Sequence, residues 1–108
     1  MLNRNAAIKL VQQFVSSCSD NNLALDKVIL FGSASRNEAG KWSDIDLAFF
    51  SKDFVGNRYT DSHLLNLIAV KKKKFLEIEP HPYPTSYFKD ETDPMVQEIK
   101  RTGIEIKI

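Results

Sequence analysis

The sequence has few of the residues that build cross-linked or membrane-bound structures. Its single cysteine, Cys18, excludes a disulfide within the chain and a cysteine-based metal site. No apolar run approaches the length needed to cross a bilayer, and the first residues lack the continuous apolar core and cleavage site of a signal peptide. We therefore expect a cytoplasmic protein without membrane contact.

The chain also lacks a strong charge of either sign. Its 15 basic and 14 acidic residues give a net charge of +1, so no global field draws it to nucleic acid. Hydrophobic residues make up 43% and charged residues 27% of the 108 residues, as in ordinary soluble globular proteins. This length predicts one domain spanning residues 1–108.

Hydrophobic periodicity predicts three helices and four strands. The first expected helix is 4–18, the second runs from a cap at Thr60 or Asp61 to about Lys73, and the third runs from Asp93-Pro94 to Gly103. The expected strands are 27–31, 45–50, 75–79 and 104–108. The prolines at 80, 82 and 84 are expected to stop the third strand. The order α-β-β-α-β-α-β indicates an α/β (α+β) fold, a small mixed sheet with packed helices.

Two motifs lie at the ends of the polar loop between the first two strands. The first motif is Gly32-Ser33, where the glycine lets a phosphate approach the backbone. The Ser33 hydroxyl and the N–H groups that follow can donate hydrogen bonds to this phosphate, and Arg36 adds positive charge. Asp44 and Asp46, two residues apart at the start of a strand, point to the same face. Such carboxylates repel each other unless a cation lies between them, and Mg²⁺ prefers oxygen ligands that it shares with phosphate.

Gly32-Ser33, ten further residues and then Asp44-x-Asp46 resemble the signature of the polymerase-beta-like nucleotidyltransferase superfamily. The spacing is similar to that of its minimal nucleotidyltransferase group, and the element order is similar over nearly the whole chain. The resemblance implies an ATP-binding enzyme with two Mg²⁺ ions, in which an acceptor hydroxyl attacks the α-phosphate and pyrophosphate leaves. It also implies that Gly32, Ser33 and Arg36 bind the nucleotide and that Asp44 and Asp46 bind the metal.

Enzymes of this superfamily often use a third carboxylate, on a neighbouring strand, as metal ligand or base. Glu77 and Glu79 share a face of the predicted third strand. Glu79 is preferred because it lies at the strand end beside a proline, and Glu77 is the alternative. His81, between two prolines, is expected in a rigid surface turn, with proton transfer or nucleotide contact as the other interpretation.

The chain is too short for the extra domain that holds the acceptor in larger relatives. The resemblance therefore implies a protein partner, a HEPN-type toxin, with this chain as the antitoxin that attaches AMP to a tyrosine. Two alternatives remain open: an antibiotic-type small-molecule acceptor, and a non-catalytic antitoxin that neutralises its partner by binding. An exposed edge strand in so small a domain also allows a homo-oligomer.

Overall fold

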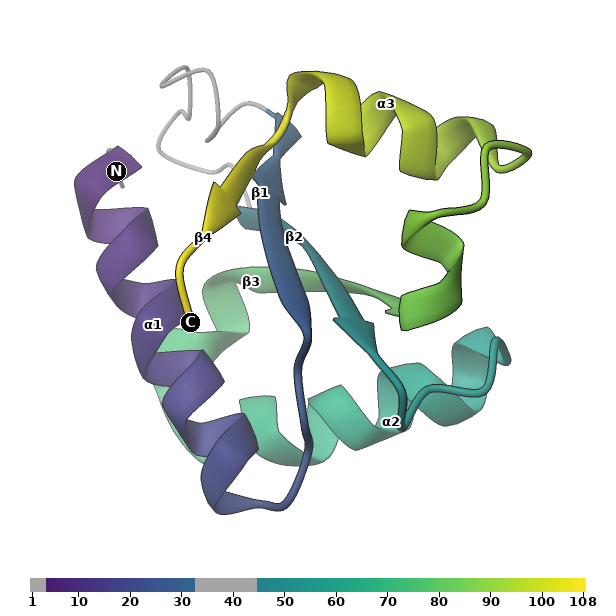
Figure 1. The fold of residues 1–108 in the computed structure, drawn as a ribbon. Helices are drawn as coiled ribbons and strands as arrows, with labels where there is room; N and C mark the ends of the chain where they lie inside the picture. The colour runs from purple at the N-terminus through teal and green to yellow at the C-terminus, as the bar shows by residue number, and fades with distance from the viewer. Residues whose placement is uncertain (1–3, 33–44) are drawn as a thin grey trace.

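A four-stranded mixed sheet with helices on both faces forms the centre of the protein (Figure 1). The computed structural model describes residues 4–32 and 45–108. The strands lie in the order β3-β2-β1-β4; β1 pairs antiparallel with β2 and β4, and β2 runs parallel to β3. The elements are α1 (Arg4–Asp20), β1 (Lys27–Phe31), β2 (Ile45–Ser51), α2 (Arg58–Ala69), η2 (Lys73–Glu77), β3 (Ile78–Pro84), η3 (Thr85–Phe88), α3 (Pro94–Thr102) and β4 (Ile104–Ile106). The predicted fold class and element order are confirmed.

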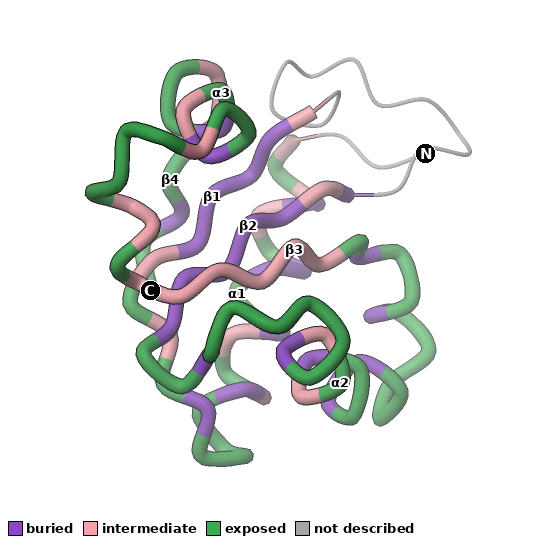
Figure 2. Tube along the Cα trace, turned by 90° about the vertical axis from the view of Figure 1, so that its right-hand side faces the viewer, coloured by how far each residue is buried: buried purple, intermediate pink, exposed green. Residues whose placement is uncertain are grey.

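The sheet separates two apolar cores, because successive strand residues point to opposite faces. Phe49 packs with α1 and α2 in the larger core, where its ring lies 5.4 Å from that of Phe14. Phe50 is equally buried, but it points to the other face and joins Val96 and Ile99 of α3. Figure 2 shows α2 and α3 on opposite sides of the strands. On the α3 face, Ala48 and Phe50 of β2 are fully buried, whereas Glu79 of β3 is exposed and His81 is half-buried.

The third strand lies further along the chain than predicted. β3 spans Ile78–Pro84 and passes through all three prolines, whereas Phe75 is buried in η2. The prediction treated the prolines as strand breakers, but β3 is an edge strand of the described sheet and pairs with β2 alone. Along a strand, backbone N–H groups point alternately to one side and to the other. Because the prolines of β3 occupy every second position, the residues between them can still donate hydrogen bonds to β2.

The start and the end of α2 also differ from the prediction. The cap is Asn57 and not Thr60 or Asp61: its side-chain oxygen accepts from two N–H groups of the first turn, at 3.0 and 3.1 Å. The helix ends at Ala69, earlier than the predicted end near Lys73.

The third helix begins and ends as predicted. Asp93 caps its first turn, Pro94 is its first residue, and Gly103 follows its last residue. The final strand stops at Ile106, two residues earlier than expected. Over the two described ranges, no helix combines the length and apolar character that a membrane crossing requires.

Candidate active site

The parallel pairing of β2 with β3 brings Asp46 and Glu79 together. These residues are direct partners in the register, so their side chains point to the same face, the one that carries α3. His81 lies two residues further along β3 on that face, and its Nε2 is 3.4 Å from Asp46 Oδ1. Asp46, Glu79 and His81 each offer one ligand atom, and these three atoms lie within 4.8 Å of one another. We call these three residues the acidic cluster.

Gly32 brings the end of β1 close to the acidic cluster. Its φ angle is +72°, in the left-handed region that favours glycine. A Cβ atom at this position would lie 2.5 Å from Asp46 Oδ2, closer than real Cβ atoms approach. The glycine therefore provides both the turn after β1 and the space that the Asp46 carboxylate occupies.

The side chain of His81 is held from two directions. Its ring packs edge-on against Phe31, with 5.0 Å between the ring centroids, and its Nε2 faces the Asp46 carboxylate. The His81 side chain is 17% exposed and that of Asp46 is 29% exposed. The predicted surface turn at His81 is therefore wrong: the residue lies in a strand, where it orients a carboxylate at a site that solvent can reach.

The other predicted site residues do not all meet at this cluster. Glu77 is exposed in η2, so the prediction that it shares a strand face with Glu79 is wrong. Ser33, Arg36 and Asp44 lie outside the described residues. Sequence reasoning did not include His81 in the cluster, although the spacing of Glu79 and His81 would have indicated a common face if the prolines had not been read as the end of the strand.

The acidic cluster fits a divalent cation. Carboxylate oxygens are the ligands that Mg²⁺ prefers, and an imidazole either adds a ligand or orients a carboxylate from the second shell. Within residues 4–32 and 45–108, no lysine or arginine forms an ion pair with Asp46 or Glu79, and His81 is the basic side chain that faces Asp46. Gly32 leaves the space in which the Asp46 carboxylate lies.

Comparison with known proteins decides the family. The nucleotidyltransferase domain family matches residues 11–106. The chain belongs to this family. The fold of this nucleotidyltransferase domain is similar to the 1.40 Å crystal structure of a provisionally assigned nucleotidyltransferase from Sulfolobus solfataricus, with a TM-score of 0.65 and 19% identity over 94% of this chain and 80% of that one. No curated protein matches the chain.

Membership of the family supports nucleotidyl transfer as the activity, with a nucleoside triphosphate as substrate. The geometry agrees, because a strand-borne carboxylate pair lies beside the glycine turn that follows β1.

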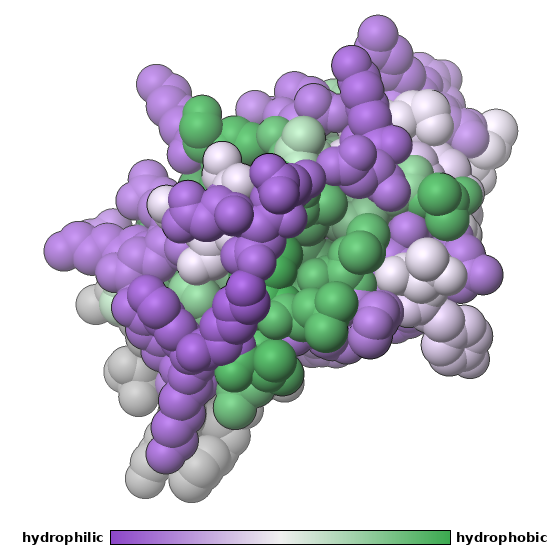
Figure 3. All heavy atoms as spheres, turned by 90° about the horizontal axis from the view of Figure 1, so that it is seen from below, coloured by the Kyte–Doolittle hydropathy of each residue, from purple (hydrophilic) through white to green (hydrophobic). Residues whose placement is uncertain are grey.

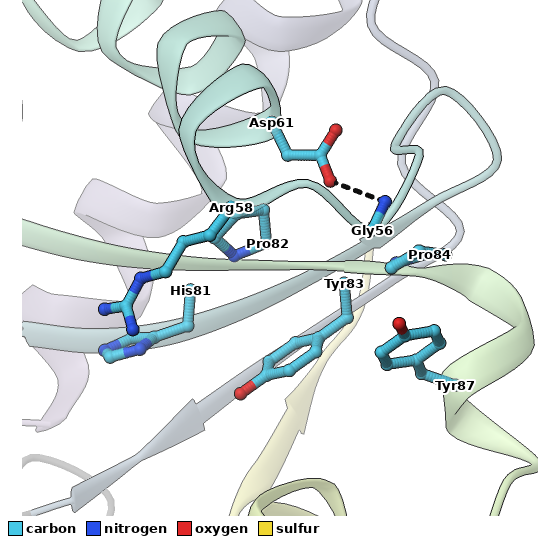
Figure 4. Close-up of a pocket in the computed structure, with 8 residues that line it drawn as sticks. All are labelled: Gly56, Arg58, Asp61, His81, Pro82, Tyr83, Pro84 and Tyr87. Carbon is cyan, nitrogen blue, oxygen red and sulfur yellow. Dashed lines mark hydrogen bonds between the residues drawn. The ribbon is translucent and has the colours of Figure 1, made fainter. Parts of the chain in front are cut away.

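The nucleotidyltransferase domain also has a cavity next to the acidic cluster. Its volume is about 150 Å³, and it runs along the outer edge of β3 toward the start of α2 (Figure 4). The lining residues are Gly56, Arg58, Asp61, His81, Pro82, Tyr83, Pro84 and Tyr87. His81 is the residue that the acidic cluster and this cavity share, so the cavity begins beside the cluster.

The loop at the rim of the cavity is fixed by Asp61. This carboxylate belongs to a residue that is only 1% exposed, and it accepts from the backbone N–H groups of Val55 and Gly56, at 3.0 and 2.9 Å. Figure 4 shows the bond from Gly56. Sequence reasoning considered Asp61 as a helix cap; its hydrogen bonds instead hold the preceding loop against the helix. The rim is therefore a built part of the fold.

Proposed function

We propose that the protein is a Mg²⁺-dependent nucleotidyltransferase that transfers AMP from ATP to a hydroxyl group. The observation that carries this proposal is the pairing of Asp46 with Glu79 directly beside the Gly32 turn. Asp46 and Glu79, with Asp44, would hold the metal, and Gly32, Ser33 and Arg36 would bind the phosphates. The bound metal would neutralise charge on the phosphate oxygens as it develops.

The transfer step follows from these assignments. The acceptor oxygen forms a bond to the α-phosphorus, the bond from that phosphorus to the β-phosphate oxygen breaks, and pyrophosphate leaves. The hydroxyl proton passes to a carboxylate, for which Glu79 is our candidate. His81 keeps the Asp46 carboxylate oriented through its Nε2. The protein thus contributes mainly by positioning groups and by electrostatics.

We further propose that the acceptor is a tyrosine of a HEPN-type toxin and that the protein acts as its antitoxin. An exposed apolar surface supports a protein partner. Figure 3 shows an apolar patch bordered by hydrophilic side chains on the side of α2. A groove of about 280 Å³ lies there, lined by exposed Leu67, half-buried Leu64, the buried residues Leu23 and Ile68, and the polar residues Asn21, Asn22 and Asp53. Lys71 borders it through a contact of its Nζ with Asn21 Oδ1 at 2.5 Å. Apolar patches rimmed by polar groups often mark protein contacts.

Transfer of label from the α-phosphate of ATP tests the proposal. The protein, Mg²⁺ and labelled ATP are added to an extract of the native host, and labelled proteins are identified by mass spectrometry. We expect a labelled band with the wild type and none with Asp46→Asn or Glu79→Gln. Glu77→Gln is the matched control, because Glu77 is exposed and outside the acidic cluster.

The same variants separate the proposal from its alternatives. If Asp46→Asn neutralises a copurifying partner as well as the wild type does, the protein is an antitoxin that acts by binding. If label appears only in a small molecule, the protein acceptor is wrong. Equal activity of Glu79→Gln and the wild type would remove Glu79 from the site.

A further inference from the structure

The cavity along β3 has walls that are fixed before any ligand binds. The ring of Tyr83 stacks on buried Phe50, with centroids 5.5 Å apart and planes 23° from parallel. Tyr87 lies beside it, with 6.2 Å between the ring centroids. The loop approaches Tyr87 closely at Gly56, where an added Cβ atom would lie 3.3 Å from the tyrosine hydroxyl. The cavity is thus an ordered slot between aromatic rings and prolines.

Arg58 brings a positive charge to this slot from the start of α2, a position that is electrostatically unfavourable for a cation. It is the first residue of α2, and the helix dipole disfavours a cation at that end. In the part of the chain that the structure describes, no carboxylate forms an ion pair with it. Its side chain nevertheless crosses the edge of β3 and points toward His81 (Figure 4). Arg58 is exposed, so its charge is available to a ligand that enters the slot.

The direction of the reaction decides which ligand fits. In an in-line displacement, the attacking and leaving oxygens lie on opposite sides of the phosphorus. Gly32, on the β1 side of Asp46, marks the end where the phosphates would lie. The cavity lies on the β3 side, so Asp46 separates the two. The attacking group would therefore arrive from the cavity.

We propose that the cavity is the acceptor pocket and that it takes a planar aromatic ring bearing the hydroxyl that is modified. This inference rests on the proposed function. The ring lies against Tyr83 and Tyr87, where stacking favours it, and the hydroxyl points past His81 toward Asp46 and Glu79. Its oxygen bonds to the α-phosphorus as pyrophosphate leaves, and its proton goes to Glu79. Arg58 lies beside this oxygen and favours its negative form.

The test uses N-acetyltyrosinamide as a phenolic probe and N-acetylserinamide as an aliphatic one. Binding is measured by amide chemical shifts in NMR, and transfer is measured with α-labelled ATP and Mg²⁺. We expect the phenolic probe to shift resonances of Tyr83 and Tyr87, and Tyr87→Leu and Arg58→Gln to weaken binding and raise the KM for this probe about tenfold or more. The controls are Tyr59→Leu, at an 89% exposed tyrosine outside the cavity, and Arg101→Gln, at an arginine paired with Glu98; both should behave as the wild type.

Two results would overturn the acceptor pocket. One is that the phenolic probe leaves the resonances of Tyr83 and Tyr87 unchanged, or that it binds the two cavity variants as tightly as the two control variants. The other is ATP itself displacing the probe from the slot, which would make the cavity a nucleobase site. Probe binding in the slot without transfer would instead contradict the nucleotidyltransferase function, and transfer to N-acetylserinamide without phenol binding would keep that function and reject the pocket.

Discussion

Replacing Gly32 by alanine should damage the acidic cluster more than it damages the fold. The φ angle of +72° costs a residue with a side chain about 1–2 kcal/mol. The added Cβ atom would lie 2.5 Å from Asp46 Oδ2, although such contacts essentially never fall below 3.0 Å. The carboxylate, or the end of β1, must therefore move by about half an ångström.

Both parts of this effect have an expected size. The free energy of unfolding should fall by about 1–2 kcal/mol, which lowers the Tm of so small a domain by about 5–10 °C. A displacement of about 1 Å can cost about 100-fold in rate, so half of that should cost about tenfold or more. Urea unfolding measures the first effect, and Mn²⁺ affinity by calorimetry, together with label transfer, measures the second.

Gly56→Ala is the matched control for this prediction. Its φ angle of +89° carries a similar backbone penalty, but its Cβ atom would meet Tyr87 and not Asp46. We expect a comparable loss of stability with unchanged Mn²⁺ affinity. If Gly32→Ala loses stability and still binds Mn²⁺ as tightly as the wild type, the reasoning about the space beside Asp46 is refuted.

Three further predictions concern buried or half-buried groups. Asp61→Ala leaves the N–H groups of Val55 and Gly56 without their acceptor, and urea unfolding should show a loss of about 3 kcal/mol; a loss below about 1 kcal/mol would contradict this. Burial raises the pKa of Cys18 to about 12, so Ellman's reagent at pH 8 should label this thiol only after denaturation. Burial, and then Asp93, raise the pKa of Tyr83 against the lowering effect of Arg58. The stability that the neutral phenol contributes is complete below the unfolded-state pKa of about 10 and is lost as the pH rises through the folded-state pKa. Alkaline titration at 295 nm of the wild type and of Tyr83→Phe checks this. The difference between the two curves should show a phenol that ionises above a pH of about 10.

Sequence reasoning predicted the elements whose signals are local. The strand Lys27–Phe31 has the predicted bounds, and α3 lies between an Asp-Pro start and a glycine end. It misplaced β3 because a proline's effect depends on whether a second neighbour needs its N–H group, which is a property of the sheet and not of the segment. The start of α2 was misplaced because Asn57 and Asp61 both suit a cap, and only the loop geometry separates their roles.

The candidate site was predictable in its residue types but not in its full membership. Asp46 and Glu79 were proposed separately, and only the parallel register, a tertiary property, makes them partners. His81 follows from that register once β3 continues past Pro80. Arg58 gave no signal in the sequence, since an arginine at the start of a helix has no motif; its significance comes from the cavity that it lines.

The alternating prolines of β3 have a consequence for how this protein can assemble. An incoming strand needs a row of N–H donors, and Pro80, Pro82 and Pro84 remove them from the outer edge of β3. Neither a second copy nor another protein can extend the described sheet on this side by backbone pairing, which also blocks cross-β aggregation there. Any partner that delivers a hydroxyl to this edge must do so with a side chain, and sheet extension is left to the three-residue edge strand β4.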